Sequence, residues 1–161
     1  MKTPKPTTQN QLIKDPMLAE VSIGYRTKIR PSERPKLTKS EDAYKYLKGI
    51  YSPDTIEHKE EFYIILLGAS SIVLGWVKVA SGNIDACMVD PRLVFQSAIL
   101  GNATAIILSH NHPSGNTRPS QQDIEMTRQL KQGGELLKIK VLDHIIVTND
   151  SYYSFGDEGT I

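Results

Sequence analysis

The sequence predicts an α/β fold, in the form of a mixed α+β sheet flanked by helices. Strand-like and helix-like segments alternate along the 161 residues, a pattern typical of helices packed on one sheet. Residues 62–67 are continuously apolar and residues 103–110 are mostly small or β-branched, and both compositions favour buried strands. A chain of this length suits one domain with its own core.

Composition and charge narrow the class of protein. Hydrophobic residues make up 39% and charged residues 23%, as in soluble globular proteins. The net charge of +1 offers no global electrostatic argument for nucleic-acid binding. No apolar run approaches the ~20 residues of a membrane helix, and the start of the chain lacks the apolar segment of a signal peptide. We therefore expect a cytoplasmic protein without membrane contact.

The single cysteine, Cys87, excludes an internal disulfide framework and suits a reducing compartment. Its neighbours are small and apolar, so we expect a buried structural thiol.

The N-terminal part differs from the rest of the chain. Residues 1–18 are polar and contain three prolines, which indicates a flexible arm. Apolar and polar residues alternate over 21–29, the period of a half-buried strand. A proline-punctuated linker follows. We expect an arm at 1–18, a strand and linker at 19–39, and the main domain at 40–161.

Three helices are predicted from their start and stop signals. The first begins near Ser40, which can cap it. The second begins at Asp90-Pro91, with proline in the first helical position. The third is capped by Ser120, and we expect Gly133-Gly134 to end it.

The remaining segments predict strands. Residues 62–67 and 72–79 flank Gly68–Ser71, which predicts a hairpin, and Trp76 in the second strand is expected to pack against the protein. Residues 138–149 hold two short apolar runs around Asp143-His144, and 152–159 indicate a last strand and turn.

Two histidines mark the end of the predicted strand at 103–110. His110 and His112 are two residues apart, so in an extended segment both rings project to the same side. Imidazole nitrogens are zinc ligands, and catalytic zinc sites take three protein ligands. A pair of surface histidines on a turn explains the same pattern.

Ser120 and Asp123 have two interpretations. Ser-x-x-Asp is a helix N-cap with an acid in the first turn, where the helix dipole favours it. A helix start aimed at the histidines can also present Asp123 to a cation, and the intervening loop has the Pro and Gly needed to turn back. Two histidines and one carboxylate form a three-ligand hydrolytic site.

A hydrolytic site needs a base that takes a proton from water. Glu60 and Glu61 precede the apolar strand on opposite faces, and periodicity alone does not choose between them. His144, between apolar residues, is either a core histidine or a residue near the site. Arg118 is either a substrate contact or an exposed loop residue.

The spacing His-x-His, seven residues, Ser, two residues, Asp resembles the JAMM (MPN+) metalloprotease motif, and His110, His112, Ser120 and Asp123 match it. The fuller string HNHPSGNTRPSQQD, with LDHIIV and YYSF downstream, is similar to the JAB domain of the bacterial RadC family over about residues 40–161. The resemblance implies a JAB/MPN, cytidine-deaminase-like fold and one Zn²⁺ per chain. It also implies Glu60 as general acid/base, with Glu61 as fallback, and Ser120 as donor to the oxyanion.

The resemblance has one departure and leaves alternatives. Full-length RadC proteins carry an N-terminal helix-hairpin-helix segment, which the first forty residues do not resemble, so the family's DNA-repair role does not transfer directly. We expect a zinc-dependent metallopeptidase or isopeptidase acting on a peptide or protein. The alternatives are a DNA-associated accessory protein that binds with the same fold, and an interaction module with a structural or vestigial metal.

Overall fold

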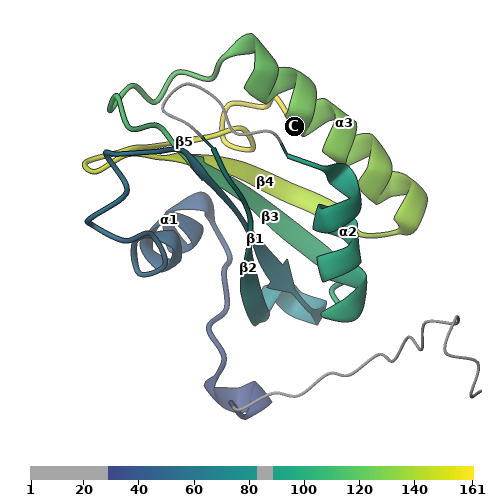
Figure 1. Ribbon diagram of the computed structural model, residues 1–161. Helices are drawn as coiled ribbons and strands as arrows, with labels where there is room; N and C mark the ends of the chain where they lie inside the picture. Colours follow the sequence, from purple (N-terminus) through teal and green to yellow (C-terminus); the bar gives the residue numbers. More distant parts are fainter. Residues whose placement is uncertain (1–28, 83–88) are drawn as a thin grey trace, which may run out of the picture.

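The computed structural model of the protein describes residues 29–82 and 89–161 (Figure 1). Within them, five strands form one sheet in the order β2-β1-β3-β4-β5. The strands are β1 (Glu61–Leu67), β2 (Val73–Ser81), β3 (Ala105–Asn111), β4 (Lys140–Val147) and β5 (Tyr152–Ser154). The helices are α1 (Ser40–Lys48), α2 (Pro91–Leu100) and α3 (Gln121–Leu137), with short 3-10 turns η2 (Pro31–Glu33) and η3 (Ala69–Ser71).

The sheet is mixed, as the sequence predicts. β1 pairs antiparallel with both β2 and β3, and β4 pairs antiparallel with β5. β3 and β4 are parallel and are joined by α3, the crossover that a parallel pair requires. The predicted arm, most of the predicted strand at 21–29 and Cys87 lie outside the described residues.

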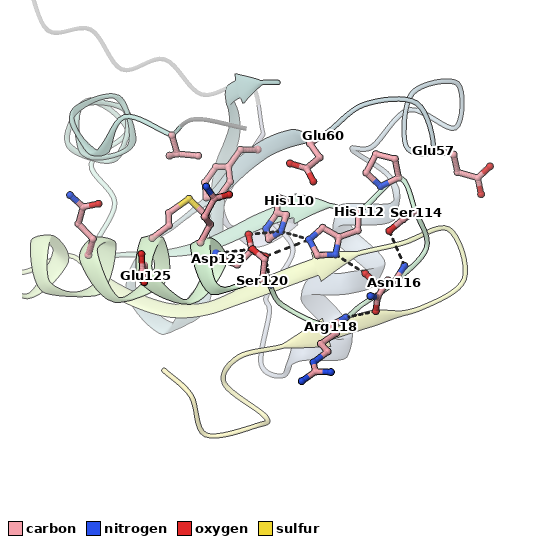
Figure 2. A pocket seen from close by; sticks show the side chains of 16 residues that line it. Glu57, Glu60, His110, His112, Ser114, Asn116, Arg118, Ser120, Asp123 and Glu125 are labelled. Carbon is pink, nitrogen blue, oxygen red and sulfur yellow. Dashed lines mark hydrogen bonds and ion pairs between the residues drawn. The ribbon is translucent and has the colours of Figure 1, made fainter. Parts of the chain in front are cut away.

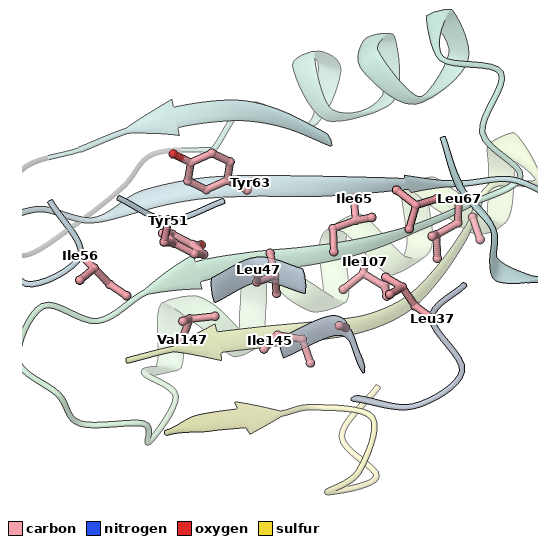
Figure 3. Packing of buried hydrophobic residues seen from close by; sticks show 13 residues of the cluster. Leu37, Leu47, Tyr51, Ile56, Tyr63, Ile65, Leu67, Ile107, Ile145 and Val147 are labelled. Carbon is pink, nitrogen blue, oxygen red and sulfur yellow. The ribbon is translucent and has the colours of Figure 1, made fainter. Parts of the chain in front are cut away.

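Helices cover both faces of the sheet, with α1 on one side and α2 and α3 on the other (Figure 1). The α1 side buries the cluster drawn in Figure 3, which includes Leu47, Tyr51, Ile65, Ile107 and Ile145. The opposite side buries a second cluster built on Phe62, Ile64, Ile106, Leu108 and Leu130. Alternate residues of β1 and β3 enter the two clusters, so both strands are buried along their whole length.

The predicted hairpin and the start of α2 are confirmed. β1 and β2 are joined by η3, where Ser70 and Ser71 adopt positive φ angles of 60° and 59°. Asp90 caps α2 by accepting from the backbone N–H of Arg92 at 2.9 Å. Trp76 packs edge-on against Tyr63 with ring centroids 5.8 Å apart, and half of its surface stays exposed.

The predicted end of α3 at Gly133-Gly134 is wrong, because the helix continues to Leu137 and ends at Lys138 in the left-handed conformation. Both glycines serve close packing inside the helix. A Cβ on Gly133 would lie 2.8 Å from the Phe95 ring, and one on Gly134 would overlap the carbonyl oxygen of Ile139.

One smaller expectation also needs correction. Ser40 is the first residue of α1, and the cap is Lys39. The carboxylate of Asp42 instead accepts from the backbone N–H of Thr38 at 2.9 Å. The two apolar runs around Asp143-His144 form one continuous strand, β4.

Among residues 29–82 and 89–161, no helix has the length and apolar character needed to cross a membrane.

Candidate metal centre

The pairing of β1 with β3 creates the frame of the site. The two strands are antiparallel with Phe62 opposite His110, so the segment entering β1 lies beside the end of β3. The side chain of His110 lies on the face of the sheet that α2 and α3 cover, as do those of Ile106 and Leu108. The loop after β3 then returns the chain to the start of α3, which brings Asp123 to the same place.

Three ligand atoms converge there (Figure 2). His110 Nε2 lies 3.1 Å from Asp123 Oδ1, and His112 Nε2 lies 3.6 Å from Asp123 Oδ2. The two Nε2 atoms are 2.9 Å apart. All three ligand atoms lie within 4.8 Å of one another, so this group could hold a metal ion. Two imidazoles and one carboxylate form a nitrogen–oxygen donor set that zinc accepts.

The outer nitrogens of both rings have partners of their own. His112 Nδ1 donates to the carbonyl oxygen of Asn116 at 2.6 Å, which leaves the lone pair of its Nε2 facing the centre. His110 Nδ1 lies 2.8 Å from Nε2 of His144. His144 is fully buried, and burial holds the pKa of its ring well below the usual value. It is therefore both a core histidine and a neighbour of the site.

The pKa values of Asp123 and His112 are shifted in opposite directions by their contact. Burial by itself raises the pKa of Asp123, but the neighbouring His110 and His112 rings outweigh it and lower that pKa strongly. Burial lowers the pKa of His112, but its hydrogen bond to Asp123 prevails and raises that pKa above the usual value. The convergent lone pairs thus attract a proton in the metal-free protein, as expected of a cation site.

Ser120 caps α3, which confirms that interpretation of Ser-x-x-Asp. Its hydroxyl donates to Asp123 Oδ2 at 2.6 Å, and its backbone N–H donates to the same oxygen at 2.7 Å. Asp123 N–H donates back to Ser120 Oγ at 3.2 Å. The cap fixes the carboxylate with Oδ1 turned toward His110, so capping and ligation use the same side-chain orientation.

The two glutamates before β1 lie in different surroundings. Glu60 lines the cavity with the histidines, and its carboxylate is directed toward their rings (Figure 2). Glu61 is 1% exposed and accepts from Lys78 Nζ at 2.8 Å and from the Tyr63 hydroxyl at 3.3 Å. Burial raises the pKa of Glu61, but the Lys78 ammonium holds it below the usual value. Of these two glutamates, Glu61 is thus engaged in an ion pair and Glu60 lines the cavity.

Asn111, the residue between the histidines, has a role that sequence patterns did not indicate. It is fully buried, and its side-chain amide donates to the carbonyl oxygens of Ile56 and Lys59 at 2.6 and 2.9 Å. Its Oδ1 accepts the backbone N–H of Glu61 at 2.7 Å. The segment that carries Glu60 is therefore attached directly to the strand that carries the histidines.

The centre opens into a cavity of about 820 Å³, a size suited to a substrate segment or small ligand. Glu57, Glu60, Asp123 and Glu125 line it, with Arg118 from the loop before α3. Among the described lining residues the acids outnumber the arginine, so the cavity disfavours anionic ligands.

Comparison with known proteins agrees with the fold. A sequence model of the RadC-like JAB domain matches residues 37–160. A UPF0758 protein of Flavobacterium johnsoniae is 43% identical over 144 residues, covering 89% of this chain and 62% of that protein. A UPF0758 protein of Symbiobacterium thermophilum is 38% identical over 145 residues, covering 90% and 61%. One of Geotalea uraniireducens is 44% identical over 104 residues, covering 64% and 46%.

The five-stranded sheet, its helices and the His-His-Asp group define a JAB-type domain with a possible metal site. The chain belongs to the RadC family, which confirms the resemblance seen in the sequence. It spans 62% or less of the length of these three relatives, and their names specify no reaction.

Proposed function

We propose that this domain is a zinc-dependent hydrolase of amide bonds, a metallopeptidase or isopeptidase of the JAMM type. The observation that carries the proposal is the convergence of His110, His112 and Asp123 in a cavity that also holds Glu60. Burial of the histidine and aspartate side chains around one point is costly unless a cation compensates the facing lone pairs.

Each residue has a chemical role in the proposal. A bound zinc ion supplies Lewis acidity, which activates water near neutral pH and polarises a carbonyl group. Glu60 takes the proton from the attacking water and delivers it to the nitrogen of the leaving amine. The new C–O bond forms first, with negative charge developing on the substrate oxygen. The C–N bond then breaks as the nitrogen receives the proton, and the products are a carboxylate and an amine.

Ser120 is the proposed donor to the oxyanion. In the present arrangement its hydroxyl hydrogen is engaged with Asp123 Oδ2 at 2.6 Å. Ser120 can serve the oxyanion only by exchanging this hydrogen bond when negative charge develops on the substrate oxygen. Its backbone N–H still holds Asp123 after the exchange.

The alternative of a DNA-binding accessory protein has less support. Phosphate binding needs a surplus of lysine or arginine, whereas the described cavity lining offers Arg118 against several carboxylates. Its test is DNA affinity as a function of salt concentration. Tight binding that weakens steeply with added salt would favour this alternative.

The first experiment is metal content by plasma mass spectrometry for the wild type, His112→Ala and Asp123→Ala. We expect about one zinc per wild-type chain and loss of the metal in both variants. The matched control is His58→Ala, which removes an exposed histidine outside the cavity and is expected to retain the metal. Wild-type protein that stays empty after zinc is added contradicts the proposal.

The second experiment separates the two glutamates. Glu60→Gln is expected to keep the metal and to release amines from a peptide library about 10²–10⁴-fold more slowly than the wild type. Glu61→Gln is the paired variant and is expected to retain both metal and turnover while losing stability. If Glu60→Gln is active while folded Glu61→Gln is inactive, Glu61 and not Glu60 is the base. A zinc-loaded wild type that cleaves no peptide or isopeptide would favour the interaction-module alternative.

A further inference from the structure

A chain of buried hydrogen bonds runs from one metal-ligand candidate to another behind the site. His110 Nδ1 lies 2.8 Å from His144 Nε2, and His144 Nδ1 lies 2.6 Å from the hydroxyl of Thr127. That hydroxyl donates to the backbone carbonyl of Asp123 at 2.5 Å. The chain therefore begins on β3, passes through β4 and ends in the first turns of α3.

The donor in each hydrogen bond can be deduced by starting from the bond between the Thr127 hydroxyl and the Asp123 carbonyl. A carbonyl oxygen only accepts, so the Thr127 hydrogen is committed to Asp123 and its oxygen accepts from His144 Nδ1–H. A neutral His144 then has no hydrogen on Nε2 and accepts from His110 Nδ1–H. The His110 ring is left with a lone pair on Nε2, the atom that lies 3.1 Å from Asp123 Oδ1.

We propose that His144 and Thr127 are positioning residues that hold His110 in the tautomer required for metal binding through Nε2. They also join His110 to the helical turn that carries Asp123. This inference rests on the proposed metal site and assigns neither residue a contact with the metal or the substrate.

Packing explains why a buried imidazole suits this role. The His144 ring stacks on Phe155 with centroids 4.8 Å apart and an angle of 12° between the planes. Phe62 lies against the same ring at 5.8 Å. These contacts fix the ring plane, so its two nitrogens present one acceptor and one donor in constant directions. Partners of this kind behind a metal-binding histidine typically change metal affinity 10–100-fold when they are removed.

The first test measures Zn²⁺ affinity by competition with a chromophoric chelator. Thr127→Val keeps the side-chain shape and removes the hydroxyl, and His144→Phe keeps an aromatic ring and removes the acceptor. We expect both to bind Zn²⁺ about 10–100-fold more weakly, and Thr127→Ser to rescue the affinity to within about twofold of the wild type, because its hydroxyl is retained.

The matched control is Ser97→Ala. Ser97 makes the same kind of helix hydrogen bond, to the carbonyl oxygen of Leu93 at 2.8 Å, in α2, and its loss is expected to leave Zn²⁺ affinity unchanged. Unchanged affinity in folded Thr127→Val and His144→Phe would overturn the inference while leaving the proposed function intact.

The second test does not depend on metal binding or on any variant. Long-range nitrogen-15 spectra of the metal-free wild type at pH 8 report which ring nitrogen of each histidine carries hydrogen. We expect hydrogen on Nδ1 of both His110 and His144. Hydrogen on Nε2 of His144 would overturn the inference even in a protein that binds zinc. A wild type with the expected tautomers that fails to bind zinc would count against the proposed function alone.

Discussion

Oδ1 of Asn111 accepts the backbone N–H of Glu61 at 2.7 Å, across fifty residues of sequence. This contact, with the two hydrogen bonds from the Asn111 amide to the preceding segment, sets the position of Glu60 relative to the histidines. The residue between the two ligand candidates thus links the segment of the proposed base to the strand of the histidines.

Asn111→Ala is expected to lower turnover more than metal affinity, because the histidines keep their strand while the Glu60 segment loses its attachment. The free energy of unfolding should fall by about 1–3 kcal/mol, since buried polar groups lose their partner. Urea denaturation and zinc stoichiometry check both effects. Asn149→Ala, at an exposed asparagine, serves as the control. An equal loss of zinc in Asn111→Ala and His112→Ala would contradict this role.

Zinc affinity should weaken as the pH falls, because a proton and the metal compete for His112 Nε2. The hydrogen bond to Asp123 outweighs burial and raises the pKa of His112, so the weakening begins above the ordinary histidine value of 6.5. Below the raised pKa, one displaced proton lowers the apparent affinity about tenfold per pH unit. Competition titrations between pH 5.5 and 8.5 measure the slope. An affinity that stays constant down to pH 6 would rule out this competition.

The two glycines inside α3 should respond differently to alanine. Gly134→Ala is expected to lower the free energy of unfolding by about 1–3 kcal/mol, because its Cβ meets the backbone carbonyl of Ile139, which cannot move aside. The Cβ in Gly133→Ala meets the Phe95 ring, which can shift, and the higher helix propensity of alanine stabilises the fold by about 1 kcal/mol. Chemical denaturation of the pair should show loss for the first and little change for the second. Equal effects would argue against the close-packing explanation.

The ion pair of Glu61 with Lys78 should stabilise the fold at neutral pH. Lys78→Met is expected to lower the free energy of unfolding by about 1–2 kcal/mol, a range reduced because Lys78 is partly exposed. The pKa of Glu61 is lowered, so the pair contributes above the ordinary value of 4.5 and its contribution is lost as the pH falls through the lower value. Denaturation at pH 7 and below pH 4 should show the difference shrinking.

The control for that pair is Lys45→Met. Lys45 and Glu41 form an exposed ion pair, and its removal is expected to leave stability unchanged at both pH values. A destabilisation by Lys78→Met that persists at low pH would mean that packing of the lysine stem, and not its charge, is responsible.

The fold class and the ligand candidates could be predicted because their signals are local. The apolar composition of 62–67 indicates a buried strand, and the spacing of His110, His112 and Asp123 lies within one strand, loop and helix start. The roles of Asn111 and Thr127 could not be predicted, because they depend on partners in other elements.

The end of α3 was predicted wrongly because glycine serves two purposes in helices. Glycine ends many helices, but Gly133-Gly134 permits close approach of Phe95 and Ile139 to a continuing helix.

Periodicity placed Glu60 and Glu61 on opposite faces, yet only the folded sheet shows which face carries the cavity. The assignment of Glu60 as the base stays a prediction.

The metal-ligand candidates are brought together by a local segment of the chain, whereas the proposed base comes from a distant one. His110, His112 and Asp123 belong to one βα unit closed by a short loop, whose ordering costs little chain entropy. Glu60 reaches the site only through the pairing of β1 with β3, a contact between segments far apart in the sequence, whose closure costs more chain entropy. We therefore expect metal binding and turnover to be separable, with substitutions in residues 56–61 abolishing the proposed turnover while the metal is still bound.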